Sequence, residues 1–410
     1  MLKIKINIFL FVIFFTLLIF SGSDSSILIN SKEFKTGSEV LLENSDLLLN
    51  KNVAVISNKS GITKSGEHLI SGLLRKGINI KKIFTPEHGF ASDDKYENEF
   101  SGIDIVSLYG EKKSFNKGDL DNIDVIIYDI QDLSVRFYTY TSTLFLTLKY
   151  AIENNKEYIV CDRPIISRGD YVAGFMLNPE YSSFVGMIPT PVYYGMTSGE
   201  LAQYLAYEAI DSKNKNLLKV IKMVGYNRNE DYNNFNIPWV NTSPSIVNVE
   251  CARIYPALCF LEGTNISEGR GTDYPFSLFG APFVDSEALL SELNTYNLPG
   301  IKFETTEFIP ASTGLSYTPK FINEKCFGLK INITDFKKFE PFEVSIAILL
   351  SLRETTPQFK WTGKNFIDKL AGTNLLRKYI DSKLTIADIC NEISNELNLF
   401  KESRNKYLLY

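Results

Sequence analysis

Short apolar runs alternate with amphipathic segments along the chain after residue 50. Short apolar runs predict buried strands, whereas apolar positions spaced three and four apart predict helices. On this basis we predict strands over residues 53–57, 78–84, 103–108, 124–128 and 158–161, and helices over residues 68–75 and 142–153. Because these strands are almost continuously apolar, we expect a parallel sheet that is covered on both faces.

The pattern changes beyond residue 190. It predicts a helix over 198–207, a strand over 218–223, an Asn- and Pro-rich stretch over 226–245, strands over 302–307 and 328–334, and helices over 341–353 and 386–397. A chain of 410 residues exceeds the usual size of one domain. We therefore predict an α/β protein with a Rossmann-like parallel-sheet domain over 37–190 and a smaller α+β domain over 191–410 that completes a cleft.

The first residues have the composition of an export signal. Lys3 and Lys5 precede an apolar run over 8–20, and small residues follow over 21–23. The run is shorter than the about 20 residues that a transmembrane helix needs, and small residues are typical of a signal-peptidase site. We predict a signal peptide over 1–23 and an exported protein, periplasmic or extracellular, without a stable membrane span once the signal is cleaved. An uncleaved anchor is the alternative.

The composition is that of a globular protein and argues against several kinds of ligand. Hydrophobic residues make up 44% and charged residues 22% of the chain, and the formal net charge is -5. This balance offers no basic patch for phosphates, so we expect no nucleic-acid partner. The five cysteines are widely spaced without a C-x-x-C pair, which indicates neither a zinc site nor a disulfide scaffold. No glycine-rich phosphate-binding motif follows a predicted strand, so we expect neither a nucleotide cofactor nor a metal.

Chemistry is expected in the loops that leave the carboxyl ends of the predicted strands, because such loops converge in one crevice of an open parallel sheet. The first of these polar loops holds Glu87 and His88, one of only two histidines in the chain. A partly buried carboxyl group is the usual proton donor to a leaving oxygen. The structural alternative is that Glu87 supports a tight turn with Gly89.

The loop after the predicted strand over 124–128 is rich in polar side chains. Acid, amide, guanidinium and phenol groups that can bind several hydroxyl groups of a ligand come from Asp129, Gln131, Asp132, Arg136, Tyr138 and Tyr140. The alternative is that Asp132 caps a helix and pairs with Arg136. The next loop begins with Asp162 and Arg163, a pair that can be architectural or catalytic.

A non-periodic segment over 261–272 combines glycines with charged and amide side chains. It contains three glycines together with Glu262, Asn265, Glu268 and Arg270. Glycines let the backbone approach a ligand closely, and the arginine fork suits a carboxylate or a phosphate. We therefore predict ligand contact here. The alternative is an interdomain turn in which Arg270 pairs with Glu262 or Glu268.

Eight motifs occur in the order that is typical of one family. They are Pro86-Glu87-His88-Gly89-Phe90, Ser107-Leu108-Tyr109-Gly110, Asp129-Ile130-Gln131-Asp132, Arg136-Phe137-Tyr138-Thr139-Tyr140, Asp162-Arg163-Pro164, Tyr194-Gly195-Met196-Thr197 with Gly199-Glu200-Leu201, Leu261 to Thr272, and Gly280-Ala281-Pro282. On these motifs the chain resembles the NamZ-type exo-β-N-acetylmuramidases, from about Gly37 to the C-terminal helices. The resemblance implies a glycoside hydrolase that removes terminal N-acetylmuramic acid from peptidoglycan-derived glycans, with its site between a Rossmann-like catalytic domain and a smaller domain.

The resemblance also implies roles for the candidate residues. Glu87 is implied as the general acid, with His88 beside it in the same motif. Hydrolysis of a glycoside needs a second group at the anomeric carbon. The candidates for this second role are Asp129, Asp132, Glu268 and Tyr138. A pocket selective for the lactyl carboxylate of N-acetylmuramic acid needs a buried arginine. The candidates are Arg270, Arg163 and Arg136, in that order. Further predicted substrate contacts are Gln131, Asp132, Tyr140, Asn265 and Glu262.

Two places depart from the family pattern. Ile165 and Ile166 follow Pro164 where the family has Asn-Pro, and Ser245 stands where the family has an asparagine. If those asparagines contact the sugar in the family, the substrate preference is shifted in this chain. Two other hypotheses stand beside the hydrolase: a non-catalytic muropeptide- or sugar-binding protein, and a different hydrolase or transferase on the same scaffold.

Overall fold

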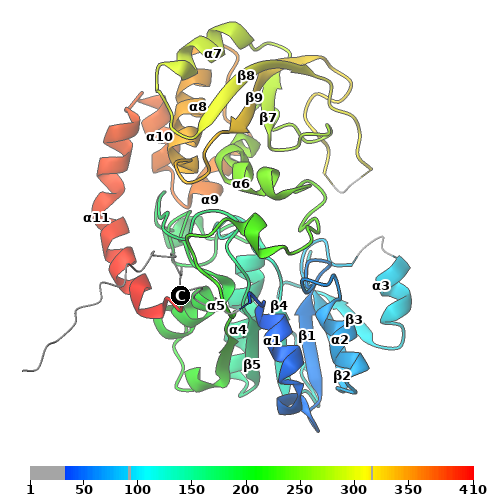
Figure 1. The fold of residues 1–410 in the computed structure, drawn as a ribbon. Coiled ribbons are helices and arrows are strands. Elements are labelled where there is room, and N and C mark those ends of the chain that lie inside the picture. The colour runs from blue at the N-terminus through cyan, green and yellow to red at the C-terminus, as the bar shows by residue number, and fades with distance from the viewer. Residues whose placement is uncertain (1–32, 91–93, 315–316) are drawn as a thin grey trace, which may run out of the picture. The chain divides into compact units, whose positions relative to one another are not determined.

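Six parallel strands form the larger sheet in the computed structural model of the protein, which describes residues 33–90, 94–314 and 317–410 (Figure 1). The strands are β1 (Val53–Ser57), β2 (Ile80–Thr85), β3 (Asp104–Ser107), β4 (Val125–Asp129), β5 (Glu157–Cys161) and β6 (Leu218–Ile221). Their order is β3-β2-β1-β4-β5-β6, and every neighbouring pair is parallel. The order reverses between β1 and β4, which is the switch point of a doubly wound, Rossmann-like sheet.

Helices cover both faces of this sheet. Successive residues of a strand point to opposite sides, so neighbouring residues of β1 pack against different helices. They are α1 (Gly37–Glu43), α2 (Leu69–Arg75), α3 (Asp94–Glu99), α4 (Tyr140–Glu153) and α5 (Ser198–Tyr204). On one side, Val55 of β1 shares a buried cluster with Leu73 of α2. On the other side, Ile56 shares a cluster with Leu144 of α4 and Leu201 of α5. The predicted parallel sheet with two covered faces is confirmed.

A smaller antiparallel sheet lies in the second half of the chain. Its strands, in the order β7-β9-β8, are β7 (Leu278–Ala281), β9 (Cys326–Ile333) and β8 (Ile301–Phe308). The helices of this half are α6 (Val249–Leu258), α7 (Ser286–Asn294), α8 (Pro341–Thr355), α9 (Phe366–Ala371), α10 (Leu375–Asp381) and α11 (Ile386–Arg404). Helix α8 contacts both α6 and α7. The predicted smaller α+β part is therefore confirmed.

Short 3-10 and π helices complete the secondary structure. They are η1 (Ser45–Leu48), η2 (Pro179–Tyr181), η3 (Leu205–Ala209), η4 (Lys215–Leu217), η5 (Tyr232–Phe235), η6 (Cys259–Gly263) and η7 (Asn405–Tyr407). Every predicted strand is present, and β1 has the predicted bounds. The sequence patterns missed β7 and the helices α1, α3, α6, α7, α9 and α10, of which α6 contains Pro256, a residue that normally ends a helix.

The division of the chain near residue 190 stays a prediction. Strand β6 follows that position and pairs with β5 in the larger sheet. The C-terminal segment also returns to this sheet, because the Tyr410 hydroxyl donates a 2.8 Å hydrogen bond to Asp162 Oδ2. The predicted signal peptide lies outside the described residues. Among the residues that are described, no helix has the length and apolar character needed to cross a membrane.

Candidate active site

A pocket with a cavity volume of about 300 Å³ lies at the carboxyl end of the larger sheet. The loops after β2, β3 and β4 supply Glu87, Tyr109 and Tyr138 to its lining. The second half of the chain supplies Glu262 and Arg270. A pocket of this size suits a small ligand such as a sugar. Its position agrees with the rule that ligands bind beyond the carboxyl ends of parallel strands.

The Glu87 carboxylate is fixed at the wall of this pocket. Thr139 Oγ1 donates a 2.7 Å hydrogen bond to Glu87 Oε2. The Tyr109 hydroxyl also hydrogen-bonds to the Glu87 side chain, and this bond together with burial raises the pKa of Tyr109 to about 12. The Glu87 side chain is still 18% exposed. It is therefore held in one orientation while remaining accessible to a ligand.

His88 lies beside Glu87 in a tight turn. His88 Nε2 is 4.0 Å from Glu87 Oε1, and burial holds the pKa of His88 below its usual value although the nearby carboxylate opposes this shift. The Gly89 N–H donates a 3.1 Å hydrogen bond to the Pro86 carbonyl, and His88 has a φ of 67°. The turn that was the structural alternative is present, and the same turn carries Glu87 and His88 into the pocket lining.

Tyr138 and Tyr140 also line the pocket, and both hydrogen-bond to Thr242. The Tyr138 hydroxyl donates a 2.7 Å hydrogen bond to Thr242 Oγ1, and the Tyr140 hydroxyl donates to the Thr242 carbonyl. Burial raises the pKa of both phenols well above the usual value. Both therefore stay protonated at neutral pH and offer hydrogen bonds rather than a phenolate nucleophile.

The second half contributes a cluster of two carboxylates and two cations. Arg270 Nε donates a 2.5 Å hydrogen bond to Glu268 Oε1, and Lys320 Nζ lies 2.9 Å from Glu268 Oε2. Arg270 Nη2 lies 3.5 Å from Glu262 Oε2. The side chains of Glu262 and Arg270 are 22% and 19% exposed, whereas that of Glu268 is 1% exposed. The predicted ion pairs of Arg270 and its predicted ligand contact are thus compatible, because Arg270 pairs at its Nε and also lines the pocket.

The two carboxyl groups of this cluster have opposite electrostatic settings. Burial raises the pKa of Glu262, with Arg270 opposing the shift. Burial acts on Glu268 too, but Lys320 and Arg270 overcome it and lower the pKa of Glu268. Glu268 is therefore an ionised support for two cations, whereas Glu262 accepts a proton more readily.

Two family descriptions match most of the chain. "Exo-beta-N-acetylmuramidase NamZ, N-terminal" matches residues 53–250, and "Exo-beta-N-acetylmuramidase NamZ, C-terminal" matches residues 253–410. The chain belongs to the NamZ family. The peptidoglycan beta-N-acetylmuramidase NamZ of Bacillus subtilis (strain 168) is 35% identical over 387 residues, which cover 92% of this chain and 91% of that protein. The resemblance inferred from the eight motifs is confirmed.

Solved structures support the same fold. Two DUF1343 family proteins of Bacteroides fragilis NCTC 9343 match the NamZ-family chain with TM-scores of 0.83 and 0.72. Their sequence identities to it are 30% and 27%, respectively. Each match covers 92% of this chain and 99% of the solved chain. The fold therefore extends over nearly the whole length of both relatives.

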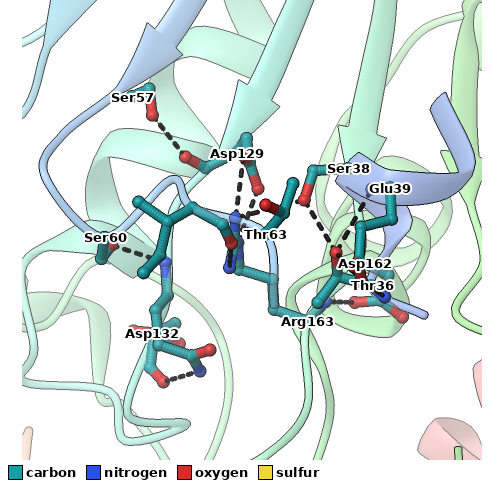
Figure 2. Close-up of polar contacts among 12 residues, drawn as sticks. Thr36, Ser38, Glu39, Ser57, Ser60, Thr63, Asp129, Asp132, Asp162 and Arg163 are labelled. Atoms are coloured by element: carbon teal, nitrogen blue, oxygen red, sulfur yellow. Dashed lines mark hydrogen bonds and ion pairs between the residues drawn. The ribbon is translucent and has the colours of Figure 1, made fainter. Parts of the chain in front are cut away.

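Asp129 and Arg163 of this NamZ-family chain form a buried ion pair away from the pocket lining (Figure 2). Arg163 Nε and Nη2 lie 2.6 and 2.9 Å from the two carboxylate oxygens of Asp129, and Nη1 donates to the Ile62 carbonyl. Their side chains are 0% and 1% exposed. The Asp162–Arg163 pairing expected from the sequence is corrected, because Asp162 accepts hydrogen bonds from Thr197 and Gly199 instead. Asp129 and Arg163 therefore stabilise the carboxyl end of the larger sheet and do not line the pocket.

Arg136 is fully buried, and its side chain hydrogen-bonds to main-chain carbonyl oxygens. Its guanidinium donates to the carbonyl oxygens of Phe175, Thr190, Leu370 and Ala371. Burial lowers the pKa of Arg136 to about 9. The predicted pairing with Asp132 is not formed, because Asp132 accepts a 2.6 Å hydrogen bond from the Tyr194 hydroxyl. Burial raises the pKa of Asp132 to about 6, and neither residue lines the pocket.

Gln131 and Asn265 also bind the protein itself. Gln131 Nε2 donates a 2.9 Å hydrogen bond to the Pro164 carbonyl. Asn265 Nδ2 donates to the Gln358 carbonyl at 2.8 Å, and its Oδ1 accepts from the Lys360 N–H at 2.9 Å.

Of the thirteen residues predicted for the site, the structure brings six to the pocket: Glu87, His88, Tyr138, Tyr140, Glu262 and Arg270. The other seven are Asp129, Gln131, Asp132, Arg136, Arg163, Asn265 and Glu268.

Several pocket residues were not predicted as site residues. Tyr109 and Thr139 bind Glu87, and both stand in motifs that were recognised. Tyr109 follows a predicted strand, so the strand-end argument that selected Glu87 applies to it equally. Tyr317 was missed because no periodic pattern surrounds it. Its hydroxyl lies 2.7 Å from Ser245 Oγ, so the position that departs from the family pattern does line the pocket.

The described part of the chain offers no obvious place for a metal ion. All five cysteines are free thiols, and four of them are buried. Within residues 33–90, 94–314 and 317–410, no group of three or more His, Cys, Asp or Glu side chains is arranged to hold a metal. Cys259 Sγ donates to Glu262 Oε1 at 3.7 Å, and burial raises the pKa of this thiol. Cys259 therefore contributes to the pocket as a neutral group.

Proposed function

We propose that the chain is an exo-acting glycoside hydrolase that releases terminal N-acetylmuramic acid from peptidoglycan-derived glycans. The observation that carries the proposal is a single pocket that holds both the fixed carboxylate of Glu87 and the guanidinium of Arg270. Membership of the NamZ family and the name of the Bacillus relative support the same substrate class.

Glu87 is the proposed proton donor to the glycosidic oxygen. Thr139 and Tyr109 hold its side chain at the pocket wall, where the partly exposed carboxyl group can deliver a proton to the leaving group. Arg270 is the proposed partner of the lactyl carboxylate, since Glu268 occupies its Nε, whereas its Nη2 has only the longer 3.5 Å contact with Glu262 and Arg270 lines the pocket. A planar guanidinium binds a carboxylate through two parallel hydrogen bonds.

We propose that the substrate itself supplies the second catalytic group, the one that acts at the anomeric carbon. Asp129, Asp132 and Glu268 are buried outside the pocket lining, and Tyr138 is held protonated. An acetamido sugar can supply its own nucleophile, as in some glycosidases that depart from the two-carboxylate scheme. The acetamido group of N-acetylmuramic acid therefore assists at the anomeric carbon while Glu87 protonates the leaving oxygen.

The decisive experiment uses a β-muramic acid glycoside with a chromogenic leaving group. The wild-type chain should release the chromophore, and Glu87→Gln should lower kcat by about 10²- to 10⁴-fold while still binding the sugar. The exposed Glu99→Gln is the matched control and should keep wild-type activity. Saturable binding of the glycoside without turnover by the wild-type chain would contradict the proposal and favour a binding protein.

We also propose that the protein is exported, to the periplasm or the extracellular space, where peptidoglycan fragments are its partners. The support is the basic, apolar and small-residue order over residues 1–23. Expression of the full chain in a bacterial host, followed by N-terminal sequencing of the mature protein, tests this. A mature protein that starts near residue 24 outside the cytoplasm is expected, and a cytoplasmic protein that retains residues 1–23 would contradict it.

A further inference from the structure

We infer that Glu262 and the carboxylate of the anionic sugar compete for Arg270, and that the sugar therefore binds together with one proton. This makes Glu262 a specificity-determining residue of the pocket. The inference rests on the proposed function for the choice of sugar, but its test measures binding rather than hydrolysis.

The two carboxylates that share Arg270 are held very differently. Glu268 is 1% exposed and receives Arg270 Nε at 2.5 Å and Lys320 Nζ at 2.9 Å. The same Lys320 ammonium donates to the carbonyl oxygens of Leu261 and Ile266, both at 2.8 Å. These two hydrogen bonds hold the Lys320 ammonium in place beside Glu268. Glu268 is therefore a permanent partner of Arg270.

Glu262 is the replaceable partner. Its Oε2 is 3.5 Å from Arg270 Nη2, and its Oε1 accepts only a weak 3.7 Å contact from Cys259 Sγ. Its side chain is 22% exposed and lines the pocket, as Arg270 does. A ligand carboxylate that approaches the Nη atoms of Arg270 therefore meets Glu262 and not Glu268.

The charges of the cluster explain why a proton must enter. Arg270 and Lys320 balance Glu262 and Glu268 when both carboxylates are ionised. A third carboxylate from the ligand would leave an uncompensated negative charge among partly buried groups, which is costly. A proton on Glu262 restores the balance and frees Arg270. Burial already raises the pKa of Glu262, and a like charge brought close raises it further.

The other groups around Glu262 leave it as the proton acceptor of this cluster. The titratable or charged groups on neighbouring elements are Tyr255 on α6, Cys259 on η6, Glu268, Arg270, Tyr317 and Lys320 on loops, and Asp368 and Lys369 on α9. Burial raises the pKa of Tyr255 and of Cys259, so both are neutral before and after binding. Asp368 is paired with Arg377 at 2.8 Å.

Two further titratable groups that line the pocket are His88 and the proposed proton donor Glu87. Burial lowers the pKa of His88, so this imidazole is neutral without a ligand. An incoming anion favours a proton on the imidazole and on the Glu87 carboxyl group as well. The experiment must therefore separate both groups from Glu262.

The test measures the Kd of N-acetylmuramic acid for the full chain between about pH 5 and pH 8, with N-acetylglucosamine as the ligand that lacks the lactyl carboxylate. For the wild type, the Kd of N-acetylmuramic acid should rise about tenfold per pH unit above the titration of Glu262, whereas that of N-acetylglucosamine should not. Glu262→Gln should remove the pH dependence and bind N-acetylmuramic acid more tightly than the wild type at pH 8.

Three control variants accompany the Glu262→Gln variant. The exposed Glu250→Gln should keep the wild-type slope. His88→Asn and Glu87→Gln should keep the slope as well, and asparagine tolerates the positive φ of position 88. A slope that persists in Glu262→Gln, or one that is lost in His88→Asn or Glu87→Gln, would overturn the assignment to Glu262.

Calorimetry of the wild type in two buffers of different ionisation enthalpy needs no variant. It should show uptake of about one proton per N-acetylmuramic acid at pH 8. Binding without proton uptake, or no binding at all, would overturn the inference. A chain that binds with proton uptake but never hydrolyses the chromogenic glycoside would keep this inference and contradict the proposed function.

Discussion

Thr139 Oγ1 donates its hydrogen bond to an oxygen of Glu87 that lies 52 residues earlier in the chain. Glu87 stands in the loop after β2, and Thr139 immediately precedes α4. The orientation of the proposed proton donor is thus fixed by a helix that packs on the larger sheet rather than by its own turn alone. Substitution of Thr139 therefore tests whether the orientation of the Glu87 carboxyl group matters for activity.

Replacing Thr139 by valine should lower kcat on the chromogenic glycoside by roughly tenfold to a hundredfold with little change in KM. Valine keeps the shape of the side chain but cannot donate, and a carboxyl group displaced by a fraction of an ångström transfers its proton poorly. Thr139→Ser keeps the hydroxyl and should retain most of the activity. Equal losses in the two variants would show that the hydroxyl does not matter.

Arg270→Lys should weaken binding of N-acetylmuramic acid by about tenfold or more and that of N-acetylglucosamine much less. Lysine keeps the positive charge but loses the planar fork that binds a carboxylate through two hydrogen bonds. Titration calorimetry at one pH with both sugars measures the two affinities. Equal losses for both sugars would reject Arg270 as the partner of the lactyl carboxylate.

Arg163→Leu should lower the free energy of unfolding by about 3–5 kcal/mol, because it leaves the buried Asp129 carboxylate without its partner. The matched control is Arg75→Leu, since the Arg75 side chain is 64% exposed and its ion pair with Glu67 should contribute less than about 1 kcal/mol. Urea unfolding followed by circular dichroism gives both values. Similar values for the two variants would argue against a supporting role for the buried pair.

Asp162 should give the stability of the protein a measurable pH dependence. Burial raises its pKa to about 7, whereas an unfolded aspartate titrates near about 3.9. Between these values the unfolded chain has released the proton that the folded chain still holds. The free energy of unfolding therefore falls as the pH rises from about 4 to about 7.

Asp162→Asn cannot ionise and should lack this contribution. Relative to the wild type it should gain stability on the order of a few kcal/mol between pH 4 and pH 7, in urea unfolding at a series of pH values. The exposed Asp121→Asn is the control and should run parallel to the wild type. If the Asp162→Asn curve is also parallel, the carboxyl group is not held protonated in the folded chain.

The sequence predicted the larger sheet well because each strand is a short apolar run, and it located Glu87 because the end of β2 was placed correctly. It could not separate pocket residues from supporting ones. Arg163 finds its carboxylate 34 residues away, and Arg136 binds a carbonyl 235 residues away. A charged side chain in a polar loop looks the same whether it faces a ligand or neutralises a buried partner. Only the folded chain decides which.

Arg136 has a consequence for how this fold varies between relatives. All its acceptors are main-chain carbonyls, a group that every amino acid supplies. Positions 175, 190, 370 and 371 can therefore change identity while these hydrogen bonds persist. Position 372 is different, since a Cβ on Gly372 would lie 2.4 Å from Arg136 Nη2 and its φ is 72°. Covariation between aligned sequences would therefore not reveal these Arg136 hydrogen bonds. They would be visible in an alignment only as an invariant arginine at position 136 and an invariant glycine at position 372.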